Sequence, residues 1–522
     1  MSTRDIRWQL NINWNGNGTS FIDESARLIS ATGNYAINAP GTPTVAGSGI
    51  ISQCTLMLGN HDGRYSTNNA GGDANSIYLQ MSSFGKYHHR EMYLNVSIDG
   101  GSNYHRVFSG VIVEINEIAP TPGEAGTVAI ECRDYSELYL NTRVSTPTND
   151  VVSLYTGDST ESDVIEAFMG QDGIGLTTGG GGLTLDDGMF VLPFAWMDDE
   201  SPIEECWSVA AAAGGWFYAD VWSESQPAFV YRNAQHWVTE AISTSAPDNE
   251  LYRSDFRQLQ VKYDHNELYR DVTVEWSARK VGSTDTVWEP EEPIIVPASS
   301  SKTVTATFRT PVYDIETLTY SAATSGGIDI SGSVSHSLGT EYAQRVDITF
   351  TNAHATYAAI LKNVVMTGKP IDGGPDGEIT TESSHSHWSG VTTGLKKRAI
   401  RSSLWVQTET HADVLSQMLA DVHEAPAAVY TITGVLGDPQ RKLGQKLRLY
   451  DDTAFDTANE KAYITSLDFS LGLTGYMQNI TAIDSEVMYA YTESDPGYFV
   501  IDTNRISINS GDAGSNRGRL FY

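Results

Sequence analysis

Two stretches far apart in the chain share one pattern of residues. GVIVEINEI, a loop and TVAIECRDYSELY resembles AYITSLDFS, a loop and MQNITAIDSEVMY. Each stretch predicts a two-stranded hairpin that closes on an Asp, a Ser, a Glu, an apolar residue and a Tyr. The matching residues are Asp134, Ser136, Glu137 and Tyr139 in the first stretch and Asp484, Ser485, Glu486 and Tyr489 in the second. Such a repeat predicts two copies of one barrel-like domain, residues 1–145 and 396–490.

Short strand patterns fill the rest of the first copy. WQLNINW, ISQCTLMLG and MYLNVSI alternate between apolar and polar residues or run apolar, and turn sequences separate them. These turns are Asn15-Gly16, Asp62-Gly63 and Asp99-Gly100-Gly101, and Gly after Asn or Asp favours tight hairpins. The predicted fold class is mainly β with small α+β parts, in several domains.

Residues 146–242 differ from the first copy because they carry two helix starts. Thr160-Glu161-Ser162-Asp163 matches a capping box, in which the first and fourth residues cap each other's backbone. Ser201-Pro202-Ile203-Glu204 places Ser at the N-cap and Pro at the first helical position, and the helix should run through Ala213. This segment is expected to form a small α+β domain.

The remaining chain predicts three further parts. Residues 243–395 are rich in strand patterns and predict a β-rich domain. The second barrel-like copy, 396–490, should hold one helix, from Thr410 to Val422 and capped by Thr410. Residues 491–522 are polar and rich in Gly, Ser and Asn, so they predict a C-terminal arm that becomes ordered in an assembly.

Charge and cysteine content narrow the classes of partner. Lys and Arg total 33 and Asp and Glu total 65, which gives the 522 residues a formal net charge of −32. So acidic a chain repels nucleic acids and anionic membrane surfaces. The N-terminus lacks the pattern of a signal peptide, and no apolar run is long enough to span a membrane. Cys54, Cys132 and Cys206 form no disulfide or metal pattern and are expected to be reduced and buried.

Gly59-Asn60-His61-Asp62 matches part of the metal-binding signature of metallophosphoesterases. A two-metal phosphoesterase also needs an Asp-x-His and a Gly-Asp-x-x-Asp motif upstream, because two neighbouring metals need several ligands. The residues before Gly59 contain neither motif. We therefore interpret the tetrad as a hairpin turn after the strand CTLML.

Other polar clusters fail comparable tests. His88 and His89 should lie on opposite faces of a strand, and His385 and His387 share a face but have no third ligand nearby. The glycines from Gly179 to Gly182 lack the Lys-Ser/Thr of a phosphate loop. The remaining candidates, none of which matches a calcium loop or a converging acid pair, are Asp186, Asp187, Asp198, Asp199, Glu200, Glu204 and Glu205. The sequence thus predicts no catalytic, cofactor-binding or metal-binding residue, and no enzyme.

Six blocks of sequence, in order, resemble the tail hub proteins of tailed phages and prophages, also called baseplate-hub or minor tail proteins. The blocks are CTLMLGNHDGRYSTNN; VSIDGGSNYHRVFSGVIVEI with IECRDYSELY; LPFAWMDDESPIEECWSVAAAAGGWFYAD; VKYDHNELYRDVTVEWSAR; ITFTNAHATYAAILKNVVMTGKPI; and SSLWVQTETHADVLSQMLADVHEAPAAVYTITGVLGDPQRKLGQKLRLYD. They span residues 50–490, and Gly59 and His61 depart from the more polar residues common in the family's turn block.

The resemblance implies a homotrimeric ring at the distal end of a tail tube, in which each chain supplies two tail-tube-like β-barrel domains. The implied partners are the tail tube, a distal tail protein, a tape measure and fibre or spike proteins, with DNA only in transit through the channel. The implied location is the virion tail tip, after assembly in the host cytoplasm. No cell-wall-degrading extension is expected.

Two alternatives and one electrostatic expectation complete the sequence-based hypotheses. A receptor- or carbohydrate-binding tail-tip module could use the chain's Trp and Tyr residues, and a hydrolase of cell-surface polymers is the least favoured function. An acidic channel would repel passing DNA, whereas a basic one would bind it. We therefore expect acids to dominate the channel wall, with Lys396, Lys397, Arg398 and Arg401 facing a protein partner.

Overall fold

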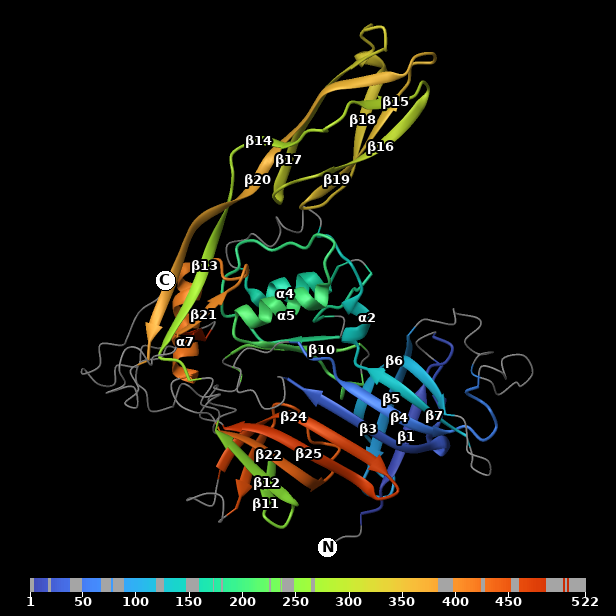
Figure 1. The fold of residues 1–522 in the computed structure, drawn as a ribbon, viewed down its shortest axis with the longest axis vertical. Coiled ribbons are helices and arrows are strands. Elements are labelled where there is room, and N and C mark those ends of the chain that lie inside the picture. The colour runs from blue at the N-terminus through green and yellow to red at the C-terminus, as the bar shows by residue number, and fades with distance from the viewer. Residues whose placement is uncertain are drawn as a thin grey trace.

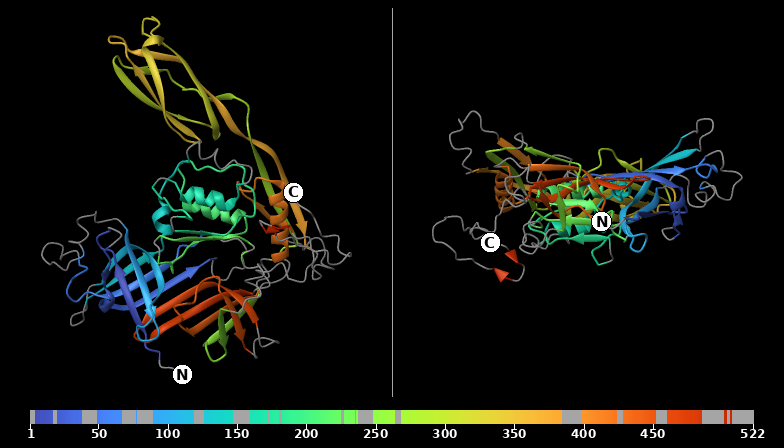
Figure 2. Two further views of the ribbon diagram at one scale, coloured as in Figure 1. Left: turned by 180° about the vertical axis from the view of Figure 1, so that it is seen from behind. Right: turned by 90° about the horizontal axis from the view of Figure 1, so that it is seen from below.

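The computed structural model describes most of the chain outside its C-terminal region. The described residues are 4–16, 20–37, 49–66, 77, 89–118, 126–146, 159–171, 173–179, 182–224, 227–234, 236, 248–263, 268–383, 398–423, 428–451, 460–484, 501–502 and 505–506. Figure 1 shows three levels: a large β-sheet body at the bottom, a helical layer above it, and a long β arm projecting from the top. Figure 2 shows the same three levels from behind. The predicted fold class, mainly β with small α+β parts and several domains, is confirmed.

The first half of the body consists of strands from the N-terminal quarter of the chain. They are β1 (Arg7–Ile12), β2 (Ile22–Asp23), β3 (Leu28–Ala36), β4 (Gln53–Gly59), β5 (Arg90–Ser97), β6 (His105–Ile118) and β7 (Thr127–Arg133), with the short helix η1 (Ser25–Arg27) before β3. Apolar residues alternate along them, so that β5 buries Met92, Leu94 and Val96 on one face.

The second half uses strands from two separate parts of the chain. They are β11 (Asn249–Tyr252), β12 (Gln258–Tyr263), β22 (Ala428–Leu436), β23 (Lys446–Tyr450), β24 (Glu460–Gly472) and β25 (Gly475–Asp484). The main path of the joined sheet is β12-β22-β25-β24-β3-β4-β7-β6-β5-β1-β2, and β23 pairs with both β24 and β11. The β3–β24 pairing unites the halves, and the described pairings leave the path open rather than closed into a barrel.

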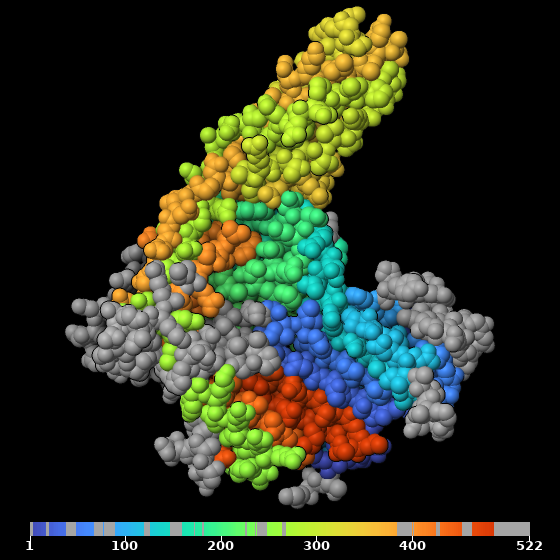
Figure 3. Space-filling model, viewed as in Figure 1, coloured from blue at the N-terminus to red at the C-terminus, as the bar shows by residue number. Residues whose placement is uncertain are grey.

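The arm interrupts the second half between β12 and β22. Its strands are β13 (Asp271–Val281), β14 (Asp285–Trp288), β15 (Ile294–Val296), β16 (Ser300–Thr307), β17 (Val312–Ala323), β18 (Val334–Glu341), β19 (Arg345–Asn352) and β20 (Ala359–Glu382), with the short helix η4 (Ser331–Ser333). At the root, Asp271 of β13 lies opposite Glu382 of β20. Figure 3 shows the arm extending away from the body as a narrow lobe.

The helical layer lies between the body and the arm. Its elements are α2 (Ser136–Leu140), α4 (Glu161–Met169), β8 (Leu183–Leu185), α5 (Pro202–Ala212), β9 (Trp216–Ala219) and β10 (Phe229–Arg232). Thr160 and Asp163 form the predicted capping box, and Ser201 is the N-cap of α5 with Pro202 in its first turn. Gly214 adopts a positive φ of 70° just beyond the helix, a conformation that favours glycine.

Strands and helices cross two of the expected domain boundaries. β11 and β12, from the expected 243–395 segment, pair with β23 and β22 of the second half. β21 (Arg398–Ser402) pairs with β13 at the arm root, and α7 (Glu409–Val422) packs on β13 and β20. The expected N-cap of α7 was wrong: Thr408, rather than Thr410, accepts a hydrogen bond from the His411 backbone N–H.

Separate cores stabilise these levels. One cluster of buried residues spans both halves of the body and includes Leu56, Leu467 and Ile480. A second unites α4, α5, α7 and β13, and a third fills the arm. Of the expected C-terminal arm, 491–522, the described residues form only the short pair β26 (Ile501–Asp502) and β27 (Arg505–Ile506), and the rest lies outside the described residues.

Candidate functional site

Gly59-Asn60-His61-Asp62 forms the turn predicted from the sequence. The Gly63 backbone N–H donates to the Asn60 carbonyl at 3.2 Å, and Gly63 has a positive φ of 69°. The Asn60 side chain accepts a hydrogen bond from the Tyr65 backbone N–H at 3.0 Å. His61 is exposed at the tip. The tetrad is therefore held by its own backbone, as expected for a hairpin connection.

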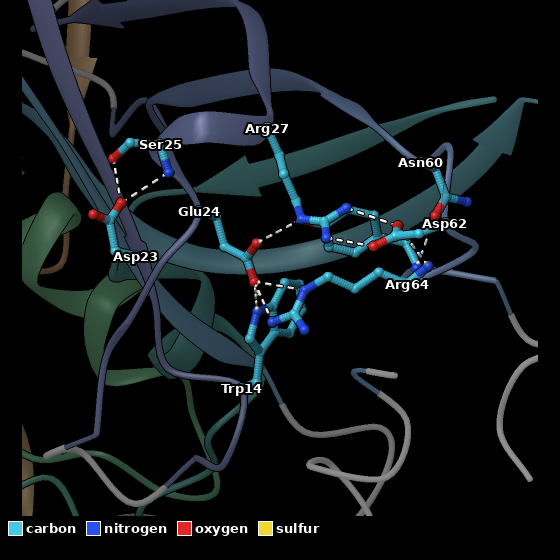
Figure 4. A network of polar contacts seen from close by, with 9 residues as sticks. Trp14, Asp23, Glu24, Ser25, Arg27, Asn60, Asp62 and Arg64 are labelled. Carbon is cyan, nitrogen blue, oxygen red and sulfur yellow. Dashed lines mark hydrogen bonds and ion pairs between the residues drawn. The ribbon is translucent and has the colours of Figure 1, made fainter. Parts of the chain in front are cut away.

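Asp62 pairs with a cation of the chain itself. Two nitrogens of the Arg27 guanidinium donate to its two carboxylate oxygens at 2.7 and 2.5 Å, as Figure 4 shows. The hydrogen bonds and charge of Arg27 hold the pKa of Asp62 well below its ordinary value. This carboxylate is already occupied by a guanidinium, which opposes metal binding at the turn.

Behind the turn lies a buried charge cluster that the sequence did not reveal, centred on Glu24. Its carboxylate accepts hydrogen bonds from Trp14 Nε1 at 2.9 Å, from Arg64 Nη2 at 2.6 Å and from Tyr65 Oη at 2.8 Å. The Glu24 side chain is 2% exposed and that of Arg64 is 9% exposed. A buried carboxylate needs this many donors, because an unpaired charge in the interior is costly. We call these four residues the Glu24 cluster, and its filled donor set indicates a structural role.

The remaining acidic candidates are dispersed. Asp186 pairs with Arg232 and His236, each at 2.8 Å. Glu204 is exposed on α5 while Glu205 is half-buried, and burial followed by the charge of Glu200 raises the pKa of Glu205 to about 7. Asp187, Asp198 and Asp199 join none of these pairs. Across the described residues no group of three His, Cys, Asp or Glu side chains is placed to hold a metal ion.

Some candidates lie wholly or partly outside the described residues. His88, His385 and His387 belong to this group, as do two of the four glycines from Gly179 to Gly182. Cys54, Cys132 and Cys206 are described, and all three are free and buried as expected. Cys54 and Cys132 lie opposite each other on β4 and β7, and burial raises the pKa of both thiols. In none of the described helices is there an apolar stretch long enough to cross a membrane.

The feature of the body that best suits a function is its internal repeat, because both halves follow one strand order. In the first half the order is β3-β4-β7-β6-β5, and in the second it is β12-β22-β25-β24-β23. Every neighbouring pair within both series is antiparallel. The two hairpins singled out by the sequence, β6–β7 and β24–β25, occupy equivalent positions, so the predicted repeat is present in the backbone.

A bulge aligns the two hairpins residue by residue. In the first, the register shifts between Ile112 and Glu114 of β6, and in the second between Ile464 and Ser466 of β24. Ile112 faces Cys132 and Ile464 faces Ala482, each two residues before the repeated Asp. Because a bulge sets the local register, Glu114 is equivalent to Ser466. Ser485, Glu486 and Tyr489 of the second motif lie outside the described residues.

The halves meet at a seam between β3 and β24. Asn34 lies opposite Asp468 and donates a hydrogen bond to its carboxylate, and Gly33 lies opposite Phe469. The Phe469 ring stacks on Tyr35 with centroids 5.6 Å apart and occupies the space where a Gly33 side chain would lie. Any side chain at position 33 would collide with that ring, so glycine is required for the two sheets to meet.

An open polar groove of about 410 Å³ runs over the seam on the exposed face of the joined sheet. Its polar lining comprises Thr32, Asn34, Gln53, Thr55, Asp468, Ser470, Gln478 and Asn479. The register places Glu131 beside Thr55, and Glu114 beside Glu131, on this same face. Arg133 also lies there and pairs with Glu137 at 2.8 Å. Short polar residues and unpaired exposed acids thus predominate on this face near the seam.

Comparison with known proteins finds similarity among solved structures only. No family model matches the chain, and no curated protein matches it. A 43 kDa tail protein of prophage MuSo2 from Shewanella oneidensis is 11% identical, with 92% of this chain and 99% of that chain covered and a TM-score of 0.43. A tail protein from Neisseria meningitidis is 8% identical, with coverages of 93% and 98% and a TM-score of 0.44.

A third similar structure is an Escherichia coli component of the type VI secretion system, described as structurally similar to bacteriophage T4 tail proteins. It is 7% identical, with 88% of this chain and 73% of that chain covered and a TM-score of 0.36. Phage and prophage tail proteins are thus among the solved structures similar to this chain, as the sequence blocks suggested. With TM-scores below 0.5, these similarities by themselves assign no function.

Proposed function

We propose that the chain is a structural hub of a tail-like tube: three copies form a ring that closes or extends the tube and anchors distal proteins. The observation that carries this proposal is the joined sheet, in which two copies of one strand order meet edge to edge through β3 and β24. A protein built this way presents two equivalent surfaces per chain. Three chains then offer six, which suits docking to a tube with six-fold symmetry.

Physical chemistry favours a closed assembly of these halves. The joined sheet is open at its ends, and exposed strand edges invite pairing with further strands. A contact that joins different surfaces of successive copies produces either a ring or an open filament. Closure into a ring leaves no such edge and therefore limits growth.

The groove side of the joined sheet is proposed to line the channel. Its exposed acids Glu114, Glu131 and Asp468 would repel passing DNA, and its short polar side chains would leave the path clear. Of the basic cluster expected to face a protein partner, Arg398 and Arg401 belong to β21 at the arm root, away from this face. Lys396 and Lys397 lie outside the described residues.

The helical layer and the arm are proposed to bind the distal tail, fibre or spike proteins, and the tube and tape measure to contact the body. The proposed location is the tail tip of a virion assembled in the host cytoplasm. No enzymatic activity is proposed, because the acidic clusters are dispersed or engaged with the chain's own donors. In particular, we expect no metal-dependent phosphatase activity with or without added Mn²⁺.

One specific observation favours a second, receptor-binding role. Tyr252 and Tyr450 stack with ring centroids 4.5 Å apart, and the Glu250 carboxylate accepts hydrogen bonds from both hydroxyls, at 3.3 and 3.1 Å. Tyr252 is 49% exposed, so its outer face is available to a sugar ring. By contrast, Trp216 and Trp222 of the helical layer are buried in the core of the body.

The ring is tested by measuring the mass and symmetry of the purified chain. Light scattering over a concentration series should show a species of three times the chain mass of 56.9 kDa. Class averages from electron microscopy should show a three-fold ring with six similar inner lobes. A chain that stays monomeric at all concentrations, or forms a two-fold dimer, would contradict the proposal.

A further inference from the structure

The seam inside the chain has an unfilled counterpart at the two ends of the joined sheet. In the second half, the outer part of β24, from Ser466 to Leu471, pairs with β3 of the first half. The equivalent outer part of β6, from Glu114 to Ile118, pairs with β7 on one side. β5 ends its pairing at Ile112, so no described strand continues along the other side.

The strand that could fill this edge is also present. β12 occupies in the second half the position that β3 occupies in the first, because it pairs with β22 as β3 pairs with β4. β3 uses its second edge to bind β24, whereas β12 ends the path of the sheet. In Figure 1, β12 and β6 lie at opposite ends of the body, so one chain cannot join them.

From this placement we propose that β12 of one copy adds to the outer part of β6 of the next copy and so repeats between chains the seam found within the chain. The contact joins different surfaces of successive copies, so it propagates in one direction around a ring. The proposal specifies how the hub proposed above is held together and therefore rests on that function.

The internal seam predicts the register. Tyr35 lies opposite Leu467, and Asn34 opposite Asp468. Through β4 and β22, Tyr35 is equivalent to Tyr263 and Asn34 to Lys262. Through the aligned hairpins, Leu467 and Asp468 are equivalent to Ile115 and Asn116. Between two copies the expected opposite pairs are therefore Ile115 with Tyr263 and Asn116 with Lys262.

Exposure supports this pairing, because the residues it would cover are unusually exposed for their type. Tyr263 is 57% exposed whereas its equivalent Tyr35 is 1% exposed. Ile118 at the end of β6 is 45% exposed, while Leu471 near the end of β24 is 3% exposed. A second copy would bury the apolar area of both, and such burial favours association.

The charges at the two edges are complementary. The outer part of β6 carries Glu114 and Glu117, and the chain around β12 carries Arg257 and Lys262. In the proposed register Lys262 lies diagonally across from Glu114, within reach of its carboxylate. At the internal seam the equivalent residues are the uncharged Asn34 and Ser466. The opposite charges thus belong to the contact between copies, where they oppose the repulsion between two chains of net charge −32.

Disulfide trapping tests the register. The variant Asn116→Cys is mixed with the variant Lys262→Cys, and the mixture is oxidised with diamide. Residues directly opposite in antiparallel strands lie within the Cα separation that a disulfide spans, roughly 4.4–6.8 Å. We expect a covalent heterodimer on a non-reducing gel, and disulfide-linked trimers when both substitutions are placed in one chain. The buried native cysteines should contribute no product.

Two controls make the result specific. Asn34→Cys with Asp468→Cys in one chain should close the equivalent bond inside the chain and so report that the seam is intact. Glu117→Cys mixed with Lys262→Cys should give no heterodimer, because neighbouring positions on β6 face opposite sides of the sheet.

The outcomes separate this inference from the hub proposal. A ring of three copies without the cross-link between positions 116 and 262 would overturn the inference and leave the hub intact. Cross-linking of Lys262→Cys with itself would indicate a two-fold β12–β12 contact and overturn the inference. A chain that remains monomeric and forms no cross-link at any concentration would overturn both.

Discussion

The two halves of the body share a strand order but differ in their buried polar centres. The first half encloses the Glu24 cluster, in which a carboxylate binds Arg64 at 2.6 Å. The second half encloses Arg441, which is 6% exposed and bonds to the neutral amides of Gln478 and Asn249. One backbone arrangement therefore tolerates opposite solutions to burying polar groups, provided that each donor and acceptor finds a partner.

Removing the charge partner should break this comparison most strongly. Glu24→Ala leaves the Arg64 guanidinium buried without a carboxylate, and loss of one partner of a buried pair costs about 3–5 kcal/mol. Gln478→Ala, at the centre of the second half, should cost about 1–3 kcal/mol because it leaves only hydrogen bonds unmade. Urea unfolding measures both free energies. Equal losses would show that charge does not distinguish the two centres.

The seam offers a matched pair of positions. Phe469 is 3% exposed, and its loss in Phe469→Ala should cost about 3 kcal/mol, near the lower end for a buried Phe because the groove lies beside the ring. The equivalent position on β6 is exposed, so Glu117→Ala should change the unfolding free energy of the monomer by less than about 0.5 kcal/mol. A comparable loss in the two variants would contradict the assignment of one edge as covered and the other as open.

The repeated Asp sharpens the comparison through pH. Asp134 is fully buried at the end of β7, and burial raises its pKa to about 6, although the Ser136 backbone N–H donates to it at 2.8 Å. A carboxyl group with a raised pKa stabilises the fold below its unfolded pKa of 3.8, and that contribution is lost as the pH rises through about 6. Stability of Asp134→Asn should therefore fall less steeply between about pH 4 and pH 6 than that of the parent chain.

The control is Asp484→Asn at the equivalent end of β25. Asp484 is only half-buried, so this substitution should leave the pH dependence nearly unchanged. Thermal unfolding followed at several pH values distinguishes the two variants, and identical curves would contradict the role assigned to Asp134.

The smallest expected effect lies on the surface of the seam. Asn34→Ala removes the hydrogen bond to Asp468 and should cost about 0.5–1 kcal/mol, as for a partly exposed hydrogen bond. Lys262→Ala, at the equivalent position of β12, should cost the monomer still less. Unfolding free energies of both variants, measured below the concentration at which copies associate, test this difference.

Local patterns predicted local structure well. The hairpins, the turn at Asp62-Gly63, the capping box at Thr160 and the start of α5 were all readable because their determinants lie within a few residues. Thr408 was overlooked because Thr410 matches the same capping pattern, and only the backbone geometry distinguishes them.

Long-range pairings were not readable in this way. β11 and β12 precede the arm in sequence but join strands that follow it, and no local signal marks their partners. The Glu24 cluster was missed because Glu24 lies between a two-residue strand and a short 3₁₀ helix, a context without periodicity. The Arg64-Tyr65 pair after the turn was its only sequence signal. In the described part of the chain, the expected catalytic and metal sites were correctly left unassigned to any cluster by chemistry, yet the absence of enzymatic activity stays a prediction.

The arm also bears on how such a protein can diversify. Its first strand starts opposite the end of its last, at Asp271 and Glu382, so the inserted segment leaves and re-enters the body at nearly one point. Recombination can exchange a segment with adjoining ends while the surrounding domain keeps its fold. The structure thus separates a conservative module, the joined sheet, from a replaceable one. A lineage could acquire a new arm of different length and surface in a single genetic event, without redesigning the sheet beneath it.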